Sequence, residues 1–321
     1  RKQGLTGRDL SRFARGTATE SAEVPDESYT DGDLAQRAVA TLKELKDKDE
    51  PFFFAVGFVR PHLPFTSPKK YWDLYDREKV GLAENRFRPR GAPSYALTTW
   101  GEMRAYSDIP RQGDLSPEKA RELRHGYYAS VSFTDANVGK LLDTLHELGL
   151  EDNTIVVLWG DHGWKLGEHN GWCKHTNFEL DANSPLIIRA PGQKSPGSKT
   201  RALVEFVDIY PTLCDLAGLK SLEHLEGISA APLLHDPQLP WKKAAFSQYP
   251  RGNVMGYSMK TDRYRFTAWK NRKTGKVEAR ELYDHQSDPA ENENVADKPE
   301  NAQLVDELLA KLNAGWQAAR P

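Results

Sequence analysis

Residues 154–178 carry the densest set of side chains that could do chemistry. The stretch reads TIVVLWGDHGWKLGEHNGWCKHTNF, and its apolar, β-branched opening predicts a buried strand of a parallel or mixed sheet, ending at Trp159. Asp161 and His162 follow at the carboxyl end of this strand, where open α/β sheets place their ligands. A glycine-rich loop then adds further charged and imidazole side chains: Lys165, Glu168, His169, Lys174 and His175. We interpret this loop as a metal or anion site.

The residue types narrow the chemistry of this site. The carboxylate of Asp161 suits a hard cation such as Ca²⁺ or Mg²⁺. The imidazole of His162 suits Zn²⁺ or Mn²⁺, or it could donate a hydrogen bond to a bound anion. Lys174 is a point charge that can neutralise sulfate or phosphate oxygens. Two alternatives stay open: Asp161 caps the next turn while His162 packs, or Cys173 is a nucleophile whose pKa nearby cations lower.

A second histidine follows another apolar run. Residues 51–59, PFFFAVGFV, are apolar on both faces, which predicts a central strand. Pro61 and Pro64 then bracket His62, and each proline fixes its own φ and biases the preceding residue to an extended form. We therefore expect His62 to be held rigidly just past the carboxyl end of a strand, although packing within a proline-rich turn would also explain it.

The remaining pattern up to residue 239 indicates an α/β fold. Ser116 and Pro117 read as an N-cap and first residue of a long helix. Residues 1–29 and 66–115 are irregular, and the second of these segments suggests a lid or a substrate-side wall. Cys214 is expected to be a core thiol. The elements expected here are helices at 30–45, 117–148 and 205–218 and a strand at 184–190.

The pattern changes near Pro240. Short alternating segments at 244–249, 254–260, 263–269 and 277–283 predict a small antiparallel sheet, and a last helix is expected over 297–319 with Leu304, Leu308 and Leu312 on one face. The predicted fold is α/β, a mixed central sheet flanked by helices, with a small C-terminal antiparallel sheet plus helix. We divide it into residues 1–239 and 240–321.

Composition excludes several classes of protein. The formal net charge is −2 over 321 residues, which gives no reason to expect binding to nucleic acid or to an acidic membrane. No apolar window approaches the roughly 18 residues of a membrane span. The chain opens with polar residues that do not form a signal peptide. Its two cysteines cannot build a disulfide framework.

Several stretches of the sequence match the pattern of a known protein family. The chain resembles the sulfatase family of the alkaline-phosphatase-like superfamily, and most closely its iduronate-2-sulfatase group with the bacterial relatives. The stretches that carry the resemblance are PFFFAVGFVRPHLPF, YYASVSFTDANVGKLLDTL, GDHGWKLGEHNGWCKHTNFE, VEFVDIYPTLCDLAG, SQYPR, MGYSMKTDRYRFTAW and ELYDHQSDPAEN. They span nearly the whole chain in the family's order.

The resemblance implies a role for each site residue. Asp161 and His162 match ligands of a catalytic Ca²⁺, with Mg²⁺ or Mn²⁺ as alternatives, and the histidine is the variant of the iduronate-sulfatase group. His62 and Lys174 match contacts to the sulfate ester. His62 could protonate the departing alkoxide, while the cation and Lys174 draw charge from the sulfate oxygens. The implied location is periplasmic, secreted or lysosomal.

The chain also departs from the family pattern. It contains neither the early Asp-Asp pair nor a Cys- or Ser-x-Pro-x-Arg motif, whose first residue becomes the nucleophilic formylglycine. The nearest match, Ser287-Asp288-Pro289, has Glu291 in place of the arginine. We therefore expect a resemblance to the C-terminal two-thirds of a sulfatase, active only with an N-terminal portion of the same enzyme.

Three functions follow as hypotheses. The first is a sulfuric ester hydrolase acting on a sulfated saccharide, in particular a sulfated uronic-acid-containing glycan. The second is an inactive remnant that binds such glycans, and the third is a phosphoester or phosphonate hydrolase of the same superfamily. Four basic residues of the C-terminal strands could meet a polyanionic chain or form an ordinary solvated face: Arg251, Lys260, Arg263 and Arg265.

Overall fold

The computed structural model describes residues 15–48 and 50–321, so the prediction for residues 1–14 lies outside the described chain. The chain forms two compact units. The described residues of the first are 15–48, 50–84, 100–154 and 166–173, and those of the second are 85–99, 155–165 and 174–321. The boundary predicted at residue 239 stays a prediction. Among the described helices, none combines the length and the apolar character needed to cross a bilayer.

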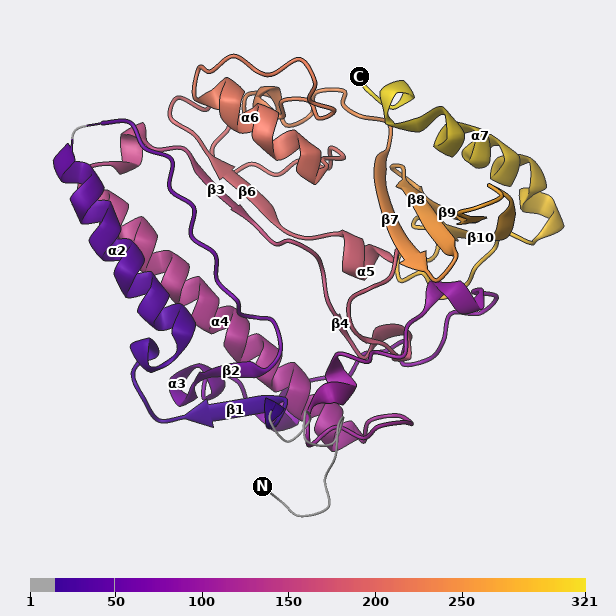
Figure 1. Cartoon of the computed structure of the whole chain (residues 1–321), viewed down its shortest axis with the longest axis horizontal. Helices are drawn as coiled ribbons and strands as arrows, with labels where there is room; N and C mark the ends of the chain where they lie inside the picture. The colour runs from indigo at the N-terminus through magenta and orange to yellow at the C-terminus, as the bar shows by residue number, and fades with distance from the viewer. Residues whose placement is uncertain (1–14, 49) are drawn as a thin grey trace. The chain divides into compact units, whose positions relative to one another are not determined.

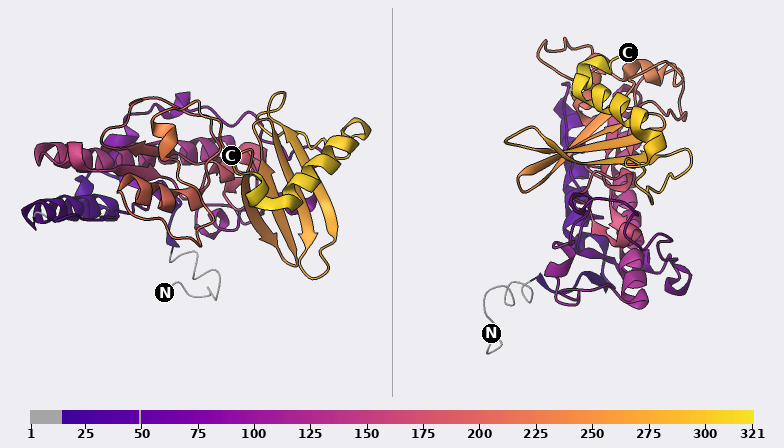
Figure 2. Two further views of the ribbon diagram at one scale, coloured as in Figure 1. Left: turned by 90° about the horizontal axis from the view of Figure 1, so that it is seen from above. Right: turned by 90° about the vertical axis from the view of Figure 1, so that its right-hand side faces the viewer.

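The first unit is built on two long helices that lie side by side (Figure 1 and Figure 2). Helix α4 (Pro117–Glu147) begins as predicted, because the Ser116 hydroxyl accepts the Lys119 N–H at 3.2 Å and proline occupies the first turn. Helix α2 (Thr30–Lys48) packs along it. Tyr71, Trp72, Ala129 and Phe133 form one buried apolar cluster of this unit.

Short elements complete the first unit. Strand β1 (Thr19–Ala22) pairs in parallel with β2 (Phe65–Pro68), so both segments predicted to be irregular contain a strand. Helix α3 (Lys69–Trp72) follows β2 directly. Strands β4 (Lys165–Leu166) and β5 (Trp172–Cys173) mark a hairpin, in which Gly167 N–H donates to Gly171 O at 2.9 Å. The single-turn 3-10 helices of this unit are η1 (Asp26–Ser28), η2 (Arg77–Lys79), η4 (Met103–Ala105), η5 (Glu151–Asn153) and η6 (Glu168–Asn170).

The strand predicted at 51–59 is wrong for the described chain. Half-buried and exposed residues alternate along this segment, but it belongs to no ladder, and Phe53 is 83% exposed. A continuous apolar run is compatible with an extended backbone, whereas a strand also needs a hydrogen-bonding neighbour. The end of the segment is fixed differently, because the buried Asp31 carboxylate accepts the N–H groups of Val59 and Arg60 at 3.1 and 2.7 Å.

In the second unit, β3 (Val156–Trp159) pairs antiparallel with β6 (Leu186–Arg189). Both strands were expected, but β3 is not buried: Trp159 is 49% exposed. The predicted helix at 205–218 is η7 (Phe206–Asp208) followed by α6 (Ile209–Leu216), on which Cys214 is buried as expected. The other short elements are η3 (Ser94–Ala96), α5 (Glu179–Ala182), η8 (Ala231–Leu234) and η9 (Pro299–Asn301).

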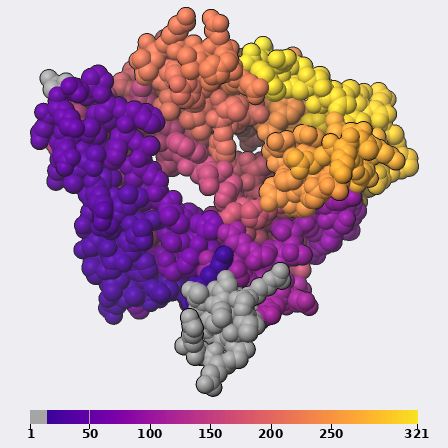
Figure 3. All heavy atoms as spheres, in the orientation of Figure 1, coloured from indigo at the N-terminus to yellow at the C-terminus, as the bar shows by residue number. Residues whose placement is uncertain are grey.

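The C-terminal part of the second unit is the predicted antiparallel sheet with its helix. Strands β7 (Ala245–Arg251), β8 (Val254–Lys260), β9 (Tyr264–Asn271) and β10 (Val277–Asp284) pair in sequence order. Helix α7 (Ala302–Ala318) crosses one face of this sheet and covers it (Figure 2 and Figure 3). Val305, Leu308 and Leu312 are its buried residues, whereas the predicted Leu304 is only half-buried.

One buried acid lies within this sheet. Glu281 accepts hydrogen bonds from Trp269 Nε1 at 2.7 Å and from Tyr283 Oη at 2.6 Å. Burial raises the pKa of Glu281 to about 7, because the low-dielectric interior disfavours the ionised carboxylate. The folded chain therefore holds a proton that the unfolded chain releases between pH 4.5 and 7.

The pH dependence of stability tests this assignment. The free energy of unfolding should fall as the pH rises from about 5 through 7, by about 1.4 kcal/mol for each pKa unit of the upward shift. Glu281→Gln cannot ionise and should flatten this decline in urea unfolding at pH 5, 6, 7 and 8. The control is Glu278→Gln, which changes an exposed carboxylate on the same strand. Parallel pH profiles for the wild type and Glu281→Gln would contradict the assignment.

Candidate functional site

The loop after β3 places the predicted pair Asp161 and His162 next to each other. Gly160 fixes the end of the strand, since its N–H donates to Pro185 O at 3.0 Å and its carbonyl accepts the Ser184 hydroxyl at 2.7 Å. His162 Nδ1 lies 2.9 Å from Gly163 O. A carbonyl oxygen only accepts, so Nδ1 carries the proton and the opposite nitrogen, Nε2, faces outward, 3.5 Å from Asp161 Oδ2.

This arrangement fits two ligands of a divalent cation. Metal-binding histidines commonly donate their second ring N–H to a backbone carbonyl, as His162 does to Gly163. The Asp161 side chain is 85% exposed, so its carboxylate is accessible rather than committed to a buried contact. A Ca²⁺ ion takes about 6–8 oxygen ligands, so the pair would supply only part of the shell.

Trp164 joins this pair to the third predicted residue, Lys174. The His162 ring stacks on Trp164 with centroids 5.9 Å apart and an interplanar angle of 27°. The Lys174 ammonium lies 4.7 Å from the centroid of Trp164, which is within cation–π range. The structure therefore brings Asp161, His162 and Lys174 together around the indole ring of Trp164. The sequence pattern alone did not predict a role for this tryptophan.

Short helix α5 fixes both ends of this loop. Asp181 accepts Lys165 Nζ at 2.7 Å and the Thr176 N–H at 2.9 Å, and it also hydrogen-bonds the Thr176 hydroxyl. Lys165 is only 2% exposed, so this ion pair is buried. Gly163 N–H donates to Asp181 O at 2.9 Å. A Cβ at residue 163 would lie 1.9 Å from Leu180 O, so the turn beside His162 requires glycine.

His62 belongs to the first unit. Its Nδ1 lies 2.8 Å from Leu63 O and its Nε2 lies 2.8 Å from Glu102 Oε1. Arg60 orders the same turn by donating to His62 O and, at 2.6 Å, to Pro64 O. Both ring nitrogens thus face oxygen atoms. The grouping of His62 with Asp161 and Lys174 stays a prediction.

The alternative nucleophile is disfavoured by burial. Cys173 has an exposed fraction of 0% and a left-handed backbone, with φ of 69°. A catalytic thiol must be accessible as well as ionised. We therefore assign Cys173 to the interior of the first unit.

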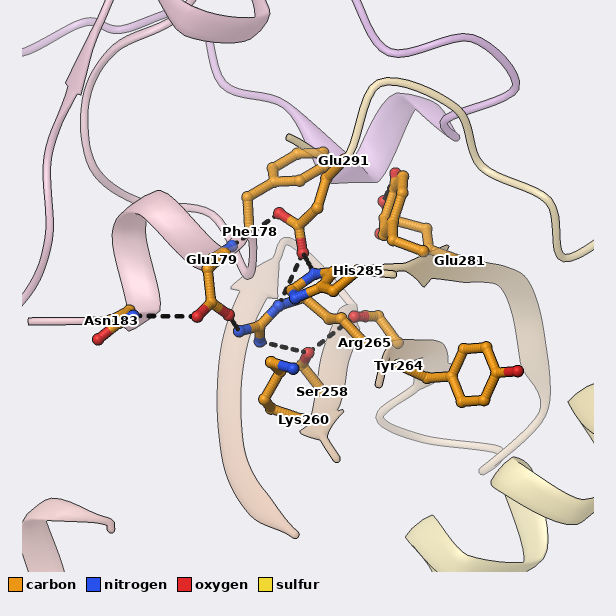
Figure 4. A network of polar contacts seen from close by, with 12 residues as sticks. Phe178, Glu179, Asn183, Ser258, Lys260, Tyr264, Arg265, Glu281, His285 and Glu291 are labelled. Carbon is orange, nitrogen blue, oxygen red and sulfur yellow. Dashed lines mark hydrogen bonds and ion pairs between the residues drawn. The ribbon is translucent and has the colours of Figure 1, made fainter. Parts of the chain in front are cut away.

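A second acidic cluster in the second unit has the composition of a metal site. Ligand atoms of Glu179, His285 and Glu291 lie within 4.8 Å of one another. Figure 4 shows that the Arg265 guanidinium lies among them: Nε is 2.9 Å from Glu291 Oε1, and Nη2 pairs with Glu179. His285 Nε2 also lies 2.9 Å from Glu291 Oε1. The positive charge of Arg265 already neutralises the two glutamates, so we interpret this cluster as a structural network and not as a metal site.

The network keeps Glu291 ionised although it is buried. Burial raises the pKa of this carboxyl, but the hydrogen bond from His285 and the charge of Arg265 together lower it below its ordinary value. Glu291 Oε2 accepts the Glu179 N–H at 2.7 Å, which caps the first turn of α5. The C-terminal sheet thereby holds the same helix that carries Asp181.

The fold of this chain is similar to the folds of several solved structures. A structure solved in complex with its substrate D-glucosamine-2-N,6-O-disulfate matches with a TM-score of 0.74 and 25% identity, covering 89% of this chain and 70% of that one. The phosphonate monoester hydrolase of Agrobacterium radiobacter matches with a TM-score of 0.78 and 24% identity, covering 94% of this chain and 64% of that one.

The chain belongs to the sulfatase family. The Sulfatase family model matches residues 3–219, and the model described as N-sulphoglucosamine sulphohydrolase, C-terminal, matches residues 167–317. Human iduronate 2-sulfatase is 30% identical over 89% of this chain, and a sulfatase from Formosa agariphila is 31% identical over 85%. The chain spans 66% and 52% of the lengths of these two relatives.

The role of Asp181 can be tested by substitution. Asp181→Asn removes the negative charge from a buried ion pair and leaves the Lys165 ammonium uncompensated, so the protein should lose about 3–5 kcal/mol of stability. The matched control is Asp73→Asn, which breaks the exposed pair with Lys69 and should cost at most about 1 kcal/mol. Urea unfolding monitored by tryptophan fluorescence measures both. Equal losses for the two variants would contradict the role given to Asp181.

Proposed function

We propose that the protein is a sulfuric ester hydrolase acting on a sulfated saccharide, with Asp161, His162 and Lys174 in its active site. The observation that carries the proposal is the sulfatase family match together with the convergence of these three residues around Trp164. A sulfated uronic-acid-containing glycan is the proposed substrate class. Its support is the similarity to iduronate 2-sulfatase and to a structure holding a sulfated glucosamine.

Each residue has a defined task in this proposal. Asp161 and His162 would hold a divalent cation, Ca²⁺ by family resemblance. When bound, the cation supplies Lewis-acid withdrawal of charge from the ester oxygens. Lys174 adds a positive charge on the same loop, oriented by its contact with Trp164. His62, hydrogen-bonded to Glu102, would deliver a proton to the departing alkoxide oxygen.

The attacking group completes the proposal. None of the 321 residues lies in a Cys- or Ser-x-Pro-x-Arg motif, so this chain offers no formylglycine precursor. We propose that an N-terminal portion of the same enzyme supplies it, together with further metal ligands. Residues 240–321 are proposed as a separate subdomain beside the catalytic one. The enzyme is proposed to act in the periplasm, a lysosome or outside the cell.

Matched substrates test the reaction class. The gene product containing these 321 residues should release sulfate from an aryl sulfate and from a sulfated disaccharide, and removal of divalent cations should abolish this. Rates on the corresponding phosphate monoester and phosphonate monoester should be lower. Faster phosphonate turnover would instead assign the chain to the activity of the Agrobacterium neighbour. Saccharide binding without any turnover would support an inactive remnant.

Asp161→Ala tests the metal role. The variant should lose cation-dependent turnover and at least about tenfold in Ca²⁺ affinity, since it lacks a carboxylate ligand. Its far-UV circular dichroism should be unchanged, because the side chain is exposed and β3 keeps its apolar contacts. Calorimetric titration with Ca²⁺ measures the affinity, and Asp73→Ala is the control for an exposed aspartate elsewhere. Full activity of Asp161→Ala at saturating Ca²⁺ would refute the assignment.

A further inference from the structure

Arg251, the last residue of β7, is a cation without a carboxylate partner. Its Nε donates to Tyr95 O at 3.1 Å, its Nη1 to Pro250 O at 3.2 Å, and its Nη2 to His175 O. All three acceptors are backbone carbonyls. Among the described residues, no carboxylate forms an ion pair with this guanidinium, although the side chain is half-buried.

The three other basic residues predicted to lie on these strands make different contacts. Arg263 forms a bidentate pair with Asp284, at 2.8 and 2.6 Å. Arg265 is buried against Glu291 and Glu179, as described above. Lys260 Nζ donates to Thr261 O at 2.6 Å. Among the described residues Lys260 likewise donates only to backbone carbonyls. Arg251 differs from it in its forked guanidinium and in its contact with the backbone of His175.

Partial burial of a guanidinium that forms no ion pair costs free energy, because the charge loses hydration. Burial lowers the pKa of Arg251, because the charged form has lost part of its hydration. A guanidinium carries five N–H donors, so the three carbonyl contacts and the hydrogen-bonding contact with the Tyr249 side chain leave at most two donors for a ligand. Planar, forked donors of this kind are suited to bidentate binding of an oxyanion.

The surroundings of Arg251 suit a saccharide. Its guanidinium lies 4.5 Å from the centroid of the Tyr249 ring, and the His175 ring lies 5.6 Å from the same ring with an interplanar angle of 53°. His175 follows Lys174 in the chain and is held through its carbonyl by Arg251. An aromatic surface and a positive charge therefore lie directly beside the residue proposed to hold the scissile ester. These residues all belong to the second unit.

We propose that Arg251, with the rings of Tyr249 and His175, binds a second anionic group of the substrate, a carboxylate or a further sulfate on the saccharide whose scissile ester lies at Lys174. This inference rests on the proposed function and specifies its substrate as a saccharide with at least two negative charges. Arg251 is a specificity residue in this scheme, because it contacts the substrate away from the bond that breaks.

Steady-state kinetics with matched substrates test the inference. The substrates are an aryl sulfate, a sulfated disaccharide with a uronic carboxylate, its carboxyl-reduced counterpart, and that counterpart with an additional sulfate. Arg251→Gln should raise KM for the doubly charged saccharides by about tenfold or more while kcat changes little, as expected when uniform binding is lost. Its kcat/KM on the aryl sulfate and on the carboxyl-reduced saccharide should stay within about twofold of the wild type.

Two further variants sharpen the result. Arg263→Gln removes the same charge from the same sheet and should leave all four substrates unaffected, because Asp284 already neutralises Arg263. Arg251→Lys keeps the charge but not the fork, so it should recover only part of the lost affinity. A KM effect confined to the additionally sulfated saccharide would identify the second group as sulfate, and one confined to the uronic substrate would identify it as carboxylate.

Other outcomes overturn the inference. Equal losses of Arg251→Gln on all four substrates would show that Arg251 only supports the His175 backbone, and unchanged KM values on every saccharide would show that it binds no substrate group. If the wild type hydrolyses no sulfate ester, the proposed function fails separately. Calorimetric binding of the uronic disaccharide then decides on Arg251: weaker binding to Arg251→Gln supports the anion subsite, and equal binding refutes it.

Discussion

The buried ion pair between Asp181 and Lys165 is the constraint on which the candidate site depends. Both charges are removed from water, so each is tolerable only while the other is present. The Asp181 carboxylate also accepts hydrogen bonds from the N–H and the hydroxyl of Thr176, and these bonds close the loop that carries Lys174. Because the same residue's carbonyl accepts the Gly163 N–H, one residue of α5 fixes the loop on both sides of its tip.

Two buried acids, one in the C-terminal sheet and one in the loop after β10, show how surroundings set ionisation. Glu291 faces the Arg265 guanidinium and His285, and its pKa is lowered in spite of its burial. Glu281 lies in the same unit but accepts from neutral donors, the indole of Trp269 and the hydroxyl of Tyr283, and burial raises its pKa. Neutral hydrogen bonds offset only part of the cost of burying a charge, whereas an opposite charge can offset all of it.

The sequence predicted what depends on local rules. The start of α4 follows from Ser116 and Pro117, and the hairpins of β7 to β10 follow from alternating residues and polar turns. The position of Asp161 and His162 after a strand was also readable, and the family match on residues 3–219 agrees with the resemblance. On α7 the sequence predicted Leu304 as the first buried residue, whereas Val305 is the buried one. The periodicity of apolar residues does not fix the rotation of a helix to within one residue.

What the sequence did not reveal depends on contacts between distant residues. Glu102 meets His62 from another loop, and no local pattern marks it as a partner. Trp164 and Arg251 lie in GDHGW and SQYPR, two of the stretches that carry the family resemblance. Their proposed roles depend on contacts with Lys174 and His175, which only the folded structure shows. For residues 51–59 the sequence predicted a strand that the described structure does not contain. An apolar sequence cannot supply the neighbouring strand that hydrogen bonding requires.

That last segment has a consequence for the behaviour of the chain in solution. Among the described residues, the apolar run at 51–59 pairs with no strand, and Phe53 is exposed, so this segment can offer its edge to a further strand. A net charge of −2 provides little colloidal repulsion to oppose such encounters. The backbone of this segment would therefore be the part of the described chain most ready to accept a further strand as a neighbour.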